Sequence, residues 1–178
     1  MRQTRSYEQK NADFKGKNPW IPQEDYEKIL RTMIVPCVDI ILHTDDERGI
    51  YLAKRIALPM ASYWCLGGRM VFSDASFEEA AARSLKRESI LEIKPSRFKF
   101  LCNHLYAWEA IAQGNFTGRN IAIVFSLKVS LKELNQIKKS LNKDEFDTGF
   151  GLQKFDRQSV LDLNVHKAMV DIFDQLFP

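Results

Sequence analysis

A single acidic residue ends an otherwise small and apolar helical stripe. Phe77, Ala81, Ser84, Leu85 and Glu88 have the spacing of one helix face. A carboxylate on a buried face costs free energy unless a cation or a hydrogen-bond donor meets it. Mg²⁺ prefers oxygen ligands and typically uses one or two carboxylates together with substrate phosphates. Glu88 is thus a candidate ligand for a divalent cation, although the residues alone favour the simpler alternative of a surface glutamate near a helix end.

A glycine pair precedes this helix in the chain. Gly67 and Gly68 let the backbone turn or approach a ligand closely, although such a pair is often only a turn. We interpret the stretch from Leu66 as strand, glycine loop, strand, loop and helix. Arg55 and Arg69 lie next to predicted loops, and an arginine donates two parallel hydrogen bonds to phosphate and keeps its charge. Each is a candidate phosphate ligand, with a solvated surface arginine as the alternative.

The helix that presents Glu88 has a marked start. Ser76 and Glu79 have the spacing of a capping box, in which each side chain satisfies a backbone amide of the first turn. Three alanines follow, and alanine is the best helix former. We therefore predict a helix from Ser76 to Glu88. Arg83 lies one turn after Glu79, so its simplest interpretation is a weak surface ion pair with that glutamate.

The loop and helix together resemble the Nudix box, the signature of Nudix hydrolases. The usual form of the box is Gly-x5-Glu-x7-Arg-Glu-U-x-Glu-Glu-x-Gly-U, where U is aliphatic. With one extra residue in the loop, Arg83 takes the place of the box arginine and Glu88 that of the last glutamate. The positions of the loop glutamate, the first and middle helix glutamates and the glycine hold Ala75, Ser84, Arg87 and Ile90.

GDP-mannose mannosyl hydrolases, a branch of the Nudix hydrolases, also keep only the last helix glutamate. Further segments resemble this branch in the same order, over roughly residues 39–166. They lie at residues 51–55, 59, 63–64, 67–69, 115–118 and 164–166. The resemblance implies an α+β fold, a Nudix-like α/β/α sandwich with a mixed β-sheet. It also implies Mg²⁺ as the cofactor, with Mn²⁺ as the alternative, and a nucleotide sugar as the substrate.

The resemblance assigns roles at the predicted metal and phosphate sites. Glu88 and the main-chain carbonyl of Gly67 would hold the metal, with Arg83 supporting them from behind. Arg55 would bind the phosphates, and Arg69 would serve both phosphate binding and catalysis. With the resemblance, metal binding becomes the favoured interpretation of Glu88, whereas a solvated surface arginine stays an equal alternative for Arg55 and for Arg69.

Asp39 and His104 are implied to contact the substrate. Asp39 lies in an apolar strand, where a carboxylate needs a partner, and the resemblance assigns it to the nucleotide base, such as guanine. The equal alternative is an outward-facing strand residue. His104 lies near the position of a functional histidine in the mannosyl hydrolases. For His104, a partly buried histidine without such a role is the slightly better interpretation.

The loop at residues 140–151 departs from the mannosyl hydrolases, which use a glutamine here as metal ligand and a histidine as general base. This chain has Phe146 and Asp147 near those positions. Many Nudix enzymes use a loop glutamate instead, although a carboxylate with an ordinary pKa is a weaker base than histidine at neutral pH. Glu145 and Asp147 are therefore the candidate catalytic bases, and an inert loop is the alternative.

Length and composition bound these expectations. The chain has 178 residues, which favours one domain at residues 21–178 preceded by a polar arm at residues 1–20. A net charge of +3 shows no nucleic-acid or membrane footprint. Cys37, Cys65 and Cys102 are widely spaced, as expected of free thiols in a reducing compartment. We expect a cytoplasmic protein, without a nucleic-acid or membrane partner, that forms a homodimer through its arm.

The remaining pattern gives further strands and helices. A hairpin is expected over residues 34–55, and a loop over residues 107–119. Strands are predicted near residues 98–104, 121–129 and 152–155. Helices are predicted to begin after Pro22, Ser130, Asp156 and Asn164.

Two functions follow from these residues. The leading hypothesis is a Mg²⁺-dependent Nudix hydrolase that releases sugar and nucleoside diphosphate from a GDP-mannose-like substrate, with attack at phosphorus as the variant reaction. The alternative is a binding protein of the same fold in which the reduced site senses a nucleotide or nucleotide sugar without turnover.

Overall fold

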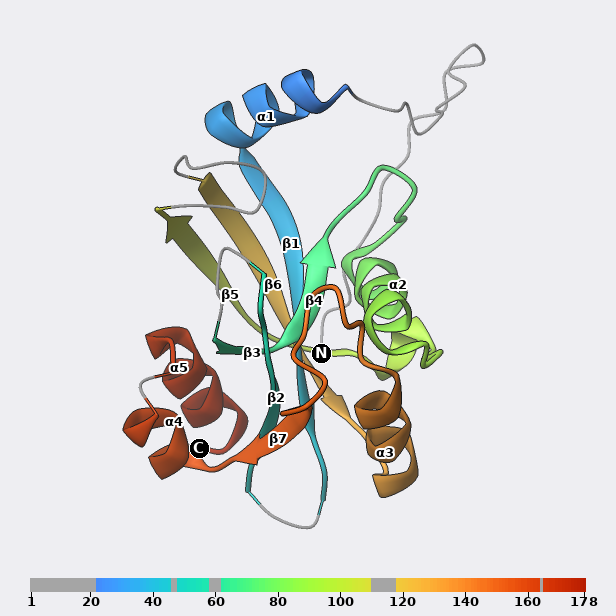
Figure 1. Cartoon of the computed structure of the whole chain (residues 1–178), viewed down its shortest axis with the longest axis vertical. Helices are drawn as coiled ribbons and strands as arrows, with labels where there is room; N and C mark the ends of the chain where they lie inside the picture. The colour runs from blue at the N-terminus through green and yellow to red at the C-terminus, as the bar shows by residue number, and fades with distance from the viewer. Residues whose placement is uncertain (1–21, 46–47, 58–61, 110–117, 164) are drawn as a thin grey trace.

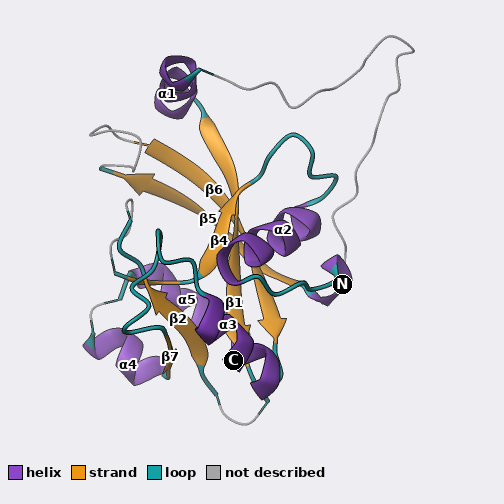
Figure 2. Cartoon of the chain, turned by 45° about the vertical axis from the view of Figure 1, so that its right-hand side comes forward, coloured by secondary structure: helices purple, strands orange, loops and turns teal. Residues whose placement is uncertain are grey.

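A mixed β-sheet lies between two layers of helices in a computed structural model, described for residues 22–45, 48–57, 62–109, 118–163 and 165–178 (Figures 1 and 2). Helices α2 (Phe77–Ser89) and α3 (Leu131–Ser140) cover one face, and α4 (Arg157–Asp162) and α5 (Lys167–Leu176) cover the other. Helix α1 (Gln23–Thr32) lies near one end of the sheet. The predicted α/β/α sandwich is confirmed.

The sheet has a main path and two attached strands. Its path runs β3-β2-β1-β6-β5; β4 pairs with β1, and β7 pairs with β2. Only the β1–β6 pair is parallel among the described pairings. The strands are β1 (Ile34–His43), β2 (Ile50–Lys54), β3 (Tyr63–Trp64), β4 (Leu66–Arg69), β5 (Lys99–Trp108), β6 (Gly118–Lys128) and β7 (Leu152–Phe155).

Strand β1 is the centre of this arrangement. One edge pairs with β6 along the whole strand, from Ile34 opposite Arg119 onward. The other edge is divided, because β4 pairs with residues 37–40 and β2 pairs only where Leu42 lies opposite Tyr51. The predicted hairpin over residues 34–55 is therefore reduced to a single residue pair, since β4 takes the edge that a full hairpin needs.

Side chains along β1 alternate between the two faces of the sheet, and residues 37–42 are buried on both faces. Val38, Ile40 and Leu42 pack in the core beneath α2 and α3, whereas Cys37 and Ile41 pack in the core beneath α5. Helices cover both faces, which explains why this strand is a nearly continuous apolar run. Asp39 shares the α5 face and is 7% exposed, so its carboxylate is an exception inside a buried strand.

Most predicted elements are present, with three corrections. The glycine pair lies within strand β4, not in a loop. Strand β5 continues to Trp108 and β6 begins at Gly118, so both strands extend into the predicted loop at residues 107–119. The last helix begins at Lys167, and its N-cap is His166, whose Nδ1 accepts a hydrogen bond from the Ala168 amide. The predicted cap, Asn164, is outside the described residues.

Helix α2 begins where its capping signal predicts. Ser76 Oγ accepts a hydrogen bond from the Glu79 amide at 3.1 Å. The Glu79 carboxylate accepts from the Ala75 amide, one residue earlier than in a standard capping box. Its buried residues include Ala81, Ser84, Leu85 and Glu88, which confirms the predicted stripe.

Two other expectations can be compared with the described residues. Cys37, Cys65 and Cys102 are free thiols, with Cys102 only partly buried. Within the described parts of the chain, the helices are too short or too polar to cross a bilayer.

Candidate active site

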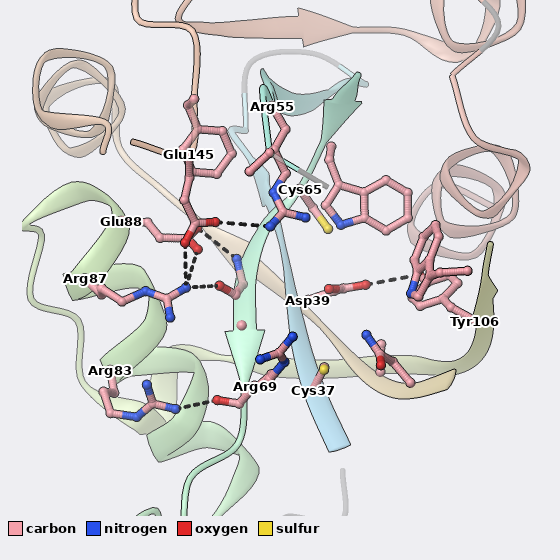
Figure 3. Close-up of a pocket in the computed structure, with 18 of the residues that line it drawn as sticks. Cys37, Asp39, Arg55, Cys65, Arg69, Arg83, Arg87, Glu88, Tyr106 and Glu145 are labelled. Atoms are coloured by element: carbon pink, nitrogen blue, oxygen red, sulfur yellow. Dashed lines mark hydrogen bonds and ion pairs between the residues drawn. The ribbon is translucent and has the colours of Figure 1, made fainter. Parts of the chain in front are cut away.

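A cavity of about 500 Å³ lies beside β4, between α2 and the aromatic residues of β3 and β5 (Figure 3). It brings together most of the residues that sequence reasoning selected. Those that line it are Asp39, Arg55, Gly67, Arg69, Arg83, Glu88 and Glu145. His104 and Asp147 are not among the lining residues.

Strand β4 forms one wall of the cavity, because Gly67 lets it lie very close to β1 and Gly68 leaves room for side chains of α2. Gly67 pairs with Asp39, and Gly68 pairs with Val38. A Cβ added to Gly67 would lie 2.1 Å from the Val38 carbonyl oxygen, far inside any normal contact. Gly67 is therefore required by close backbone approach, and it places its amide and carbonyl beside α2.

Glu88 is buried in this wall, with 2% of its surface exposed. Its Oε2 accepts a hydrogen bond from the Gly67 amide at 3.1 Å, and its Oε1 lies 2.7 Å from Arg87 Nη2. Burial raises the pKa of Glu88 to about 7, although Arg87 and the Gly67 amide act in the opposite direction. The predicted alternative of a solvated surface glutamate is wrong.

Arg87 supplies the cation that this buried carboxylate meets. The same Nη2 donates to the Gly67 carbonyl at 3.1 Å and lies 3.6 Å from Glu145 Oε1 (Figure 3). Sequence reasoning noted Arg87 only as a departure from the Nudix box. The available signal was its position directly before Glu88 on the same helical turn, where it replaces an acid.

Glu145 reaches the cavity from the loop between α3 and β7. Its Oε2 accepts a hydrogen bond from Arg55 Nη2 at 3.2 Å. Backbone bonds hold the loop in place, because the Glu145 carbonyl accepts from Ile56 and Phe146 forms an isolated bridge with Arg55. The loop carboxylate and the phosphate-binding candidate Arg55 are thus one ion pair on the cavity wall.

Asp147, the other predicted base, has a different position. Its Oδ1 accepts hydrogen bonds from the Gly149 amide at 3.0 Å and from the Phe150 amide at 3.4 Å. Its own amide donates to the Lys54 carbonyl. Asp147 therefore stabilises the turn that follows Glu145, because its carboxylate accepts hydrogen bonds from two backbone amides of that turn.

Arg83 braces the cavity wall from behind. Its Nε and Nη2 donate to the two carboxylate oxygens of Asp74 at 2.7 and 2.8 Å, and Nη2 also donates to the Arg69 carbonyl. These hydrogen bonds hold the pKa of Asp74 below its usual value, against the opposing effect of burial. The predicted partner Glu79 is replaced by Asp74, so Arg83 ties the end of β4 and the following loop to α2.

Asp39 lies at the opposite end of the cavity, where its partner is neutral. Tyr106 Oη donates a hydrogen bond to its Oδ2 at 3.1 Å. Burial raises the pKa of Asp39 to about 6, with Tyr106, Cys65 and the nearby positive charges of His104 and Arg55 lowering it less. The Asp39 carboxyl group is therefore largely ionised at neutral pH, so it can accept hydrogen bonds from a ligand.

His104 lies behind Tyr106. Its Nδ1 is 3.3 Å from Tyr106 Oη, and its Nε2 is 2.7 Å from Asp171 Oδ2 on α5. Tyr106 also donates to Asp39, so Asp171, His104, Tyr106 and Asp39 form one chain of polar contacts. His104 thus acts on the cavity through Tyr106, because β5 continues past it and turns its side chain toward α5.

Aromatic rings surround Asp39. Trp64, Tyr106 and Trp108 pack edge to face or tilted, with centroids 5.2 to 5.8 Å apart. His166 packs on Trp64 with ring centroids 5.5 Å apart and so supports this aromatic cluster. The buried indole N–H of Trp108 has no hydrogen-bond partner within the described residues. This end of the cavity is therefore lined by largely buried aromatic side chains and by the Asp39 carboxylate, which can accept hydrogen bonds.

Comparisons with solved structures agree on the fold. No family model matches the sequence, and no curated protein does. The C. elegans Ap4A hydrolase is 12% identical, with a TM-score of 0.51 over 81% of this chain and 96% of that chain. A mutT/nudix family protein from Listeria innocua is 21% identical, with a TM-score of 0.54 over 80% and 91%. The chain has the Nudix fold.

A third similar structure is the NUDIX domain of Shewanella oneidensis NrtR, complexed with ADP ribose. It is 14% identical, with a TM-score of 0.55 over 89% of this chain and the whole of that domain. This chain spans 61% of a longer NrtR chain. Identities this low establish the fold alone.

The divalent cation that a Nudix fold implies can be tested against these residues. The described residues contain no group of three or more His, Cys, Asp or Glu side chains able to hold a metal ion. The expected ligands, the Glu88 carboxylate and the Gly67 carbonyl, both accept hydrogen bonds from Arg87 Nη2. As arranged, this oxygen set holds a guanidinium group and does not fit Mg²⁺ or Mn²⁺.

Proposed function

We propose that the chain binds a nucleoside diphosphate sugar of the GDP-mannose class and hydrolyses it to sugar and nucleoside diphosphate. The observation that supports this most is the division of the cavity. Arg55, Arg69 and Arg87 line one end, and Asp39 with aromatic side chains lines the other. A ligand with a diphosphate next to a nucleoside matches both.

The guanidinium end suits a diphosphate. Arg69 lines this end, and burial together with the nearby charge of Arg87 lowers its pKa, against the opposing effect of Glu145. A bound phosphate would favour the charged form of Arg69 and accept forked hydrogen bonds from a guanidinium group. The NUDIX domain of NrtR, which has the same fold, was crystallised with ADP ribose, a diphosphate of this kind.

The aromatic end suits a nucleobase. Flat rings stack on aromatic side chains, and the Asp39 carboxylate accepts hydrogen bonds from a base edge that carries N–H donors. Guanine presents two adjacent N–H donors on one edge, whereas adenine presents a donor beside an acceptor. We therefore assign guanine to Asp39.

Glu145 is the proposed general base. In this reaction, Glu145 takes a proton from a water molecule whose oxygen bonds to the anomeric carbon of the sugar. The bond between that carbon and the β-phosphate oxygen breaks, and its electron pair remains on the phosphate. Arg55 and Arg69 stabilise the negative charge that develops there. Attack at phosphorus would instead give a nucleoside monophosphate and a sugar phosphate.

A binding protein without turnover is the second candidate. One observation favours it: the carboxylates of Glu88 and Glu145 at this end of the cavity both lie against guanidinium groups. A carboxylate oxygen that already accepts a hydrogen bond from a guanidinium group is less available to accept a proton from water. Ligand binding would then have to displace an arginine before Glu145 could take a proton.

The test is product analysis with GDP-mannose, ADP ribose and Ap4A, each with EDTA, Mg²⁺ or Mn²⁺. Chromatography and phosphorus NMR distinguish free mannose with GDP from GMP with mannose phosphate. We expect mannose and GDP from GDP-mannose, and no products from the E145Q variant. Binding by calorimetry without products under every condition would favour the binding protein, and absence of both would overturn the proposal.

A further inference from the structure

One nitrogen atom of Arg87 lies among three oxygens of the cavity wall. Nη2 is 2.7 Å from Glu88 Oε1, 3.1 Å from the Gly67 carbonyl oxygen and 3.6 Å from Glu145 Oε1. The three oxygens come from a helix, a strand and a loop that are distant in sequence. Convergence of this kind is typical of a cation site, and here the cation is part of the chain.

Compared with the Nudix box, two positions of this helix carry less negative charge. Where the Nudix box has its first and middle helix glutamates, this chain has Ser84 and Arg87. The helix thus loses two negative charges and gains a positive one. Glu88 remains, and because it is 2% exposed it needs a positive or hydrogen-bonding partner that stays in place.

The positive and negative charges of the ion pairs around the site also balance. Arg87 pairs with Glu88, and Arg55 pairs with Glu145, whose other oxygen faces Arg87. A divalent cation entering this group would meet carboxylates that are already compensated and two guanidinium groups that repel it. Mg²⁺ also requires several oxygens in near-octahedral geometry, and its protein ligands here are hydrogen-bonded to Arg87.

We propose that the Arg87 guanidinium takes the place of the divalent cation, so that this site holds a diphosphate without Mg²⁺. The inference rests on the proposed function insofar as the ligand is a nucleoside diphosphate. Arg87 lines the cavity and its side chain is 45% exposed, so part of the group can reach a ligand while Nη2 holds the wall. An arginine serves this purpose because its charge is permanent and it has five N–H donors.

The first experiment measures metal binding to the ligand-free protein, by electron paramagnetic resonance of added Mn²⁺. We expect the wild-type chain to leave millimolar Mn²⁺ free. Arg87→Ala exposes the carboxylates, and Arg87→Glu restores the acid of the box, so both should bind Mn²⁺ at least about tenfold more tightly. Arg87→Lys, which keeps a positive charge, should resemble the wild type.

The matched control is Lys86→Glu. Lys86 lies on the same helix but pairs with Glu92 away from the cavity, at 2.6 Å. This variant makes the same change in net charge as Arg87→Glu without altering the oxygen cluster, so it should not gain Mn²⁺ binding. Far-UV circular dichroism and thermal unfolding establish which variants fold; the wild type and the Arg87→Lys variant still decide the question if the others do not.

The second experiment measures the affinity for GDP and GDP-mannose by calorimetry. For the wild type, we expect dissociation constants in EDTA and in Mg²⁺ that agree within about threefold. Arg87→Ala should bind about tenfold more weakly in EDTA and regain affinity with Mg²⁺. Tight Mn²⁺ binding by the wild type that Glu88→Gln abolishes, or ligand binding that requires Mg²⁺, would overturn the inference.

The two experiments separate this inference from the proposed function. If no nucleotide binds under any condition, the proposed ligand is wrong, while the Mn²⁺ measurement still decides whether Arg87 replaces a metal. If nucleotides bind and Mn²⁺ does too, the ligand class is supported and the role of Arg87 is wrong.

Discussion

The two ends of the cavity treat a buried carboxylate differently. At the α2 end, Glu88 faces a guanidinium nitrogen at 2.7 Å, and Glu145 faces another at 3.2 Å. At the sheet end, Asp39 accepts a hydrogen bond from the neutral hydroxyl of Tyr106 at 3.1 Å, and His104 lies behind that tyrosine. The first end is internally neutralised, whereas the second keeps an acceptor available to a ligand.

This difference indicates how the cavity can discriminate between ligands. An anion must compete with carboxylates for the arginines, so its charge and geometry matter more than its identity. A base at the sheet end meets an acceptor without a strong competitor, so its hydrogen-bonding pattern matters. Affinity should therefore depend mainly on the first end and base preference on the second.

The largest effect is expected where the ends meet, at Gly67. The variant G67A places a Cβ 2.1 Å from the Val38 carbonyl oxygen, which forces β4 away from β1. We expect a loss of at least about 3 kcal/mol in the free energy of unfolding, measured by urea denaturation. G149A is the control, because the nearest atom to its new Cβ is a side-chain oxygen at 3.2 Å. Equal stability of the two variants would contradict the close approach of β4 to β1.

The next effect concerns the pH dependence at the sheet end. Burial raises the pKa of Asp39 from 3.8 to about 6, so the folded state binds this proton more tightly than the unfolded state. Binding of this proton stabilises the folded state fully below pH 3.8, the pKa of Asp39 in the unfolded chain. This stabilisation is lost as the pH rises through about 6, the pKa in the folded state. Relative to D39N, wild-type stability should fall by about 2 kcal/mol between about pH 4.5 and pH 7.5. Parallel pH profiles of the two proteins would show that Asp39 is not perturbed.

A smaller effect separates the two ends by ligand binding. The variant R55A removes a guanidinium from the cavity and leaves Glu145 with one fewer partner. We expect about tenfold weaker binding of GDP and of ADP alike. In D39N, by contrast, the preference for GDP over ADP should decrease while the affinity for ADP stays nearly constant. Calorimetry with both nucleotides measures all four values, and a base-dependent effect of R55A would contradict this division.

The smallest effect lies outside the cavity. Ile90 ends α2 in the left-handed conformation, with φ of 57°, and its side chain is 69% exposed. A β-branched residue is strained there, whereas glycine is not. We expect I90G to stabilise the chain by about 1 kcal/mol without changing nucleotide affinity. A loss of stability would mean that the exposed isoleucine makes a contribution that its conformation does not reveal.

Local sequence patterns predicted the part of the site that α2 presents. The capping signal at Ser76 and the stripe that ends at Glu88 depend on residues a few positions apart, and both are present in α2. Gly67 was predicted to approach a ligand closely, and its required close approach is instead to β1. The sequence indicated the correct residue, and the partner strand could not be read from the local pattern.

The remaining features depend on contacts between distant segments. The partners of Arg87 lie on β4 and in the loop after α3, so its position among three oxygens has no local signal. Asp147 and Glu145 are only two residues apart, yet the turn at residues 147–149 uses one carboxylate and leaves the other facing Arg55. The homodimer depends on residues 1–20, which lie outside the described residues, and it stays a prediction.

The pairing of β1 has a consequence for how the chain reaches this state. Strand β1 (Ile34–His43) is synthesised early in the chain. Its parallel partner, residues 119–128 of β6, is synthesised much later, so this edge of β1 stays unpaired until then. Until then, an apolar strand carrying Asp39 has a long unpaired edge, which is a template for association with other chains. Fragments that stop before β6 should therefore aggregate instead of forming a smaller native unit.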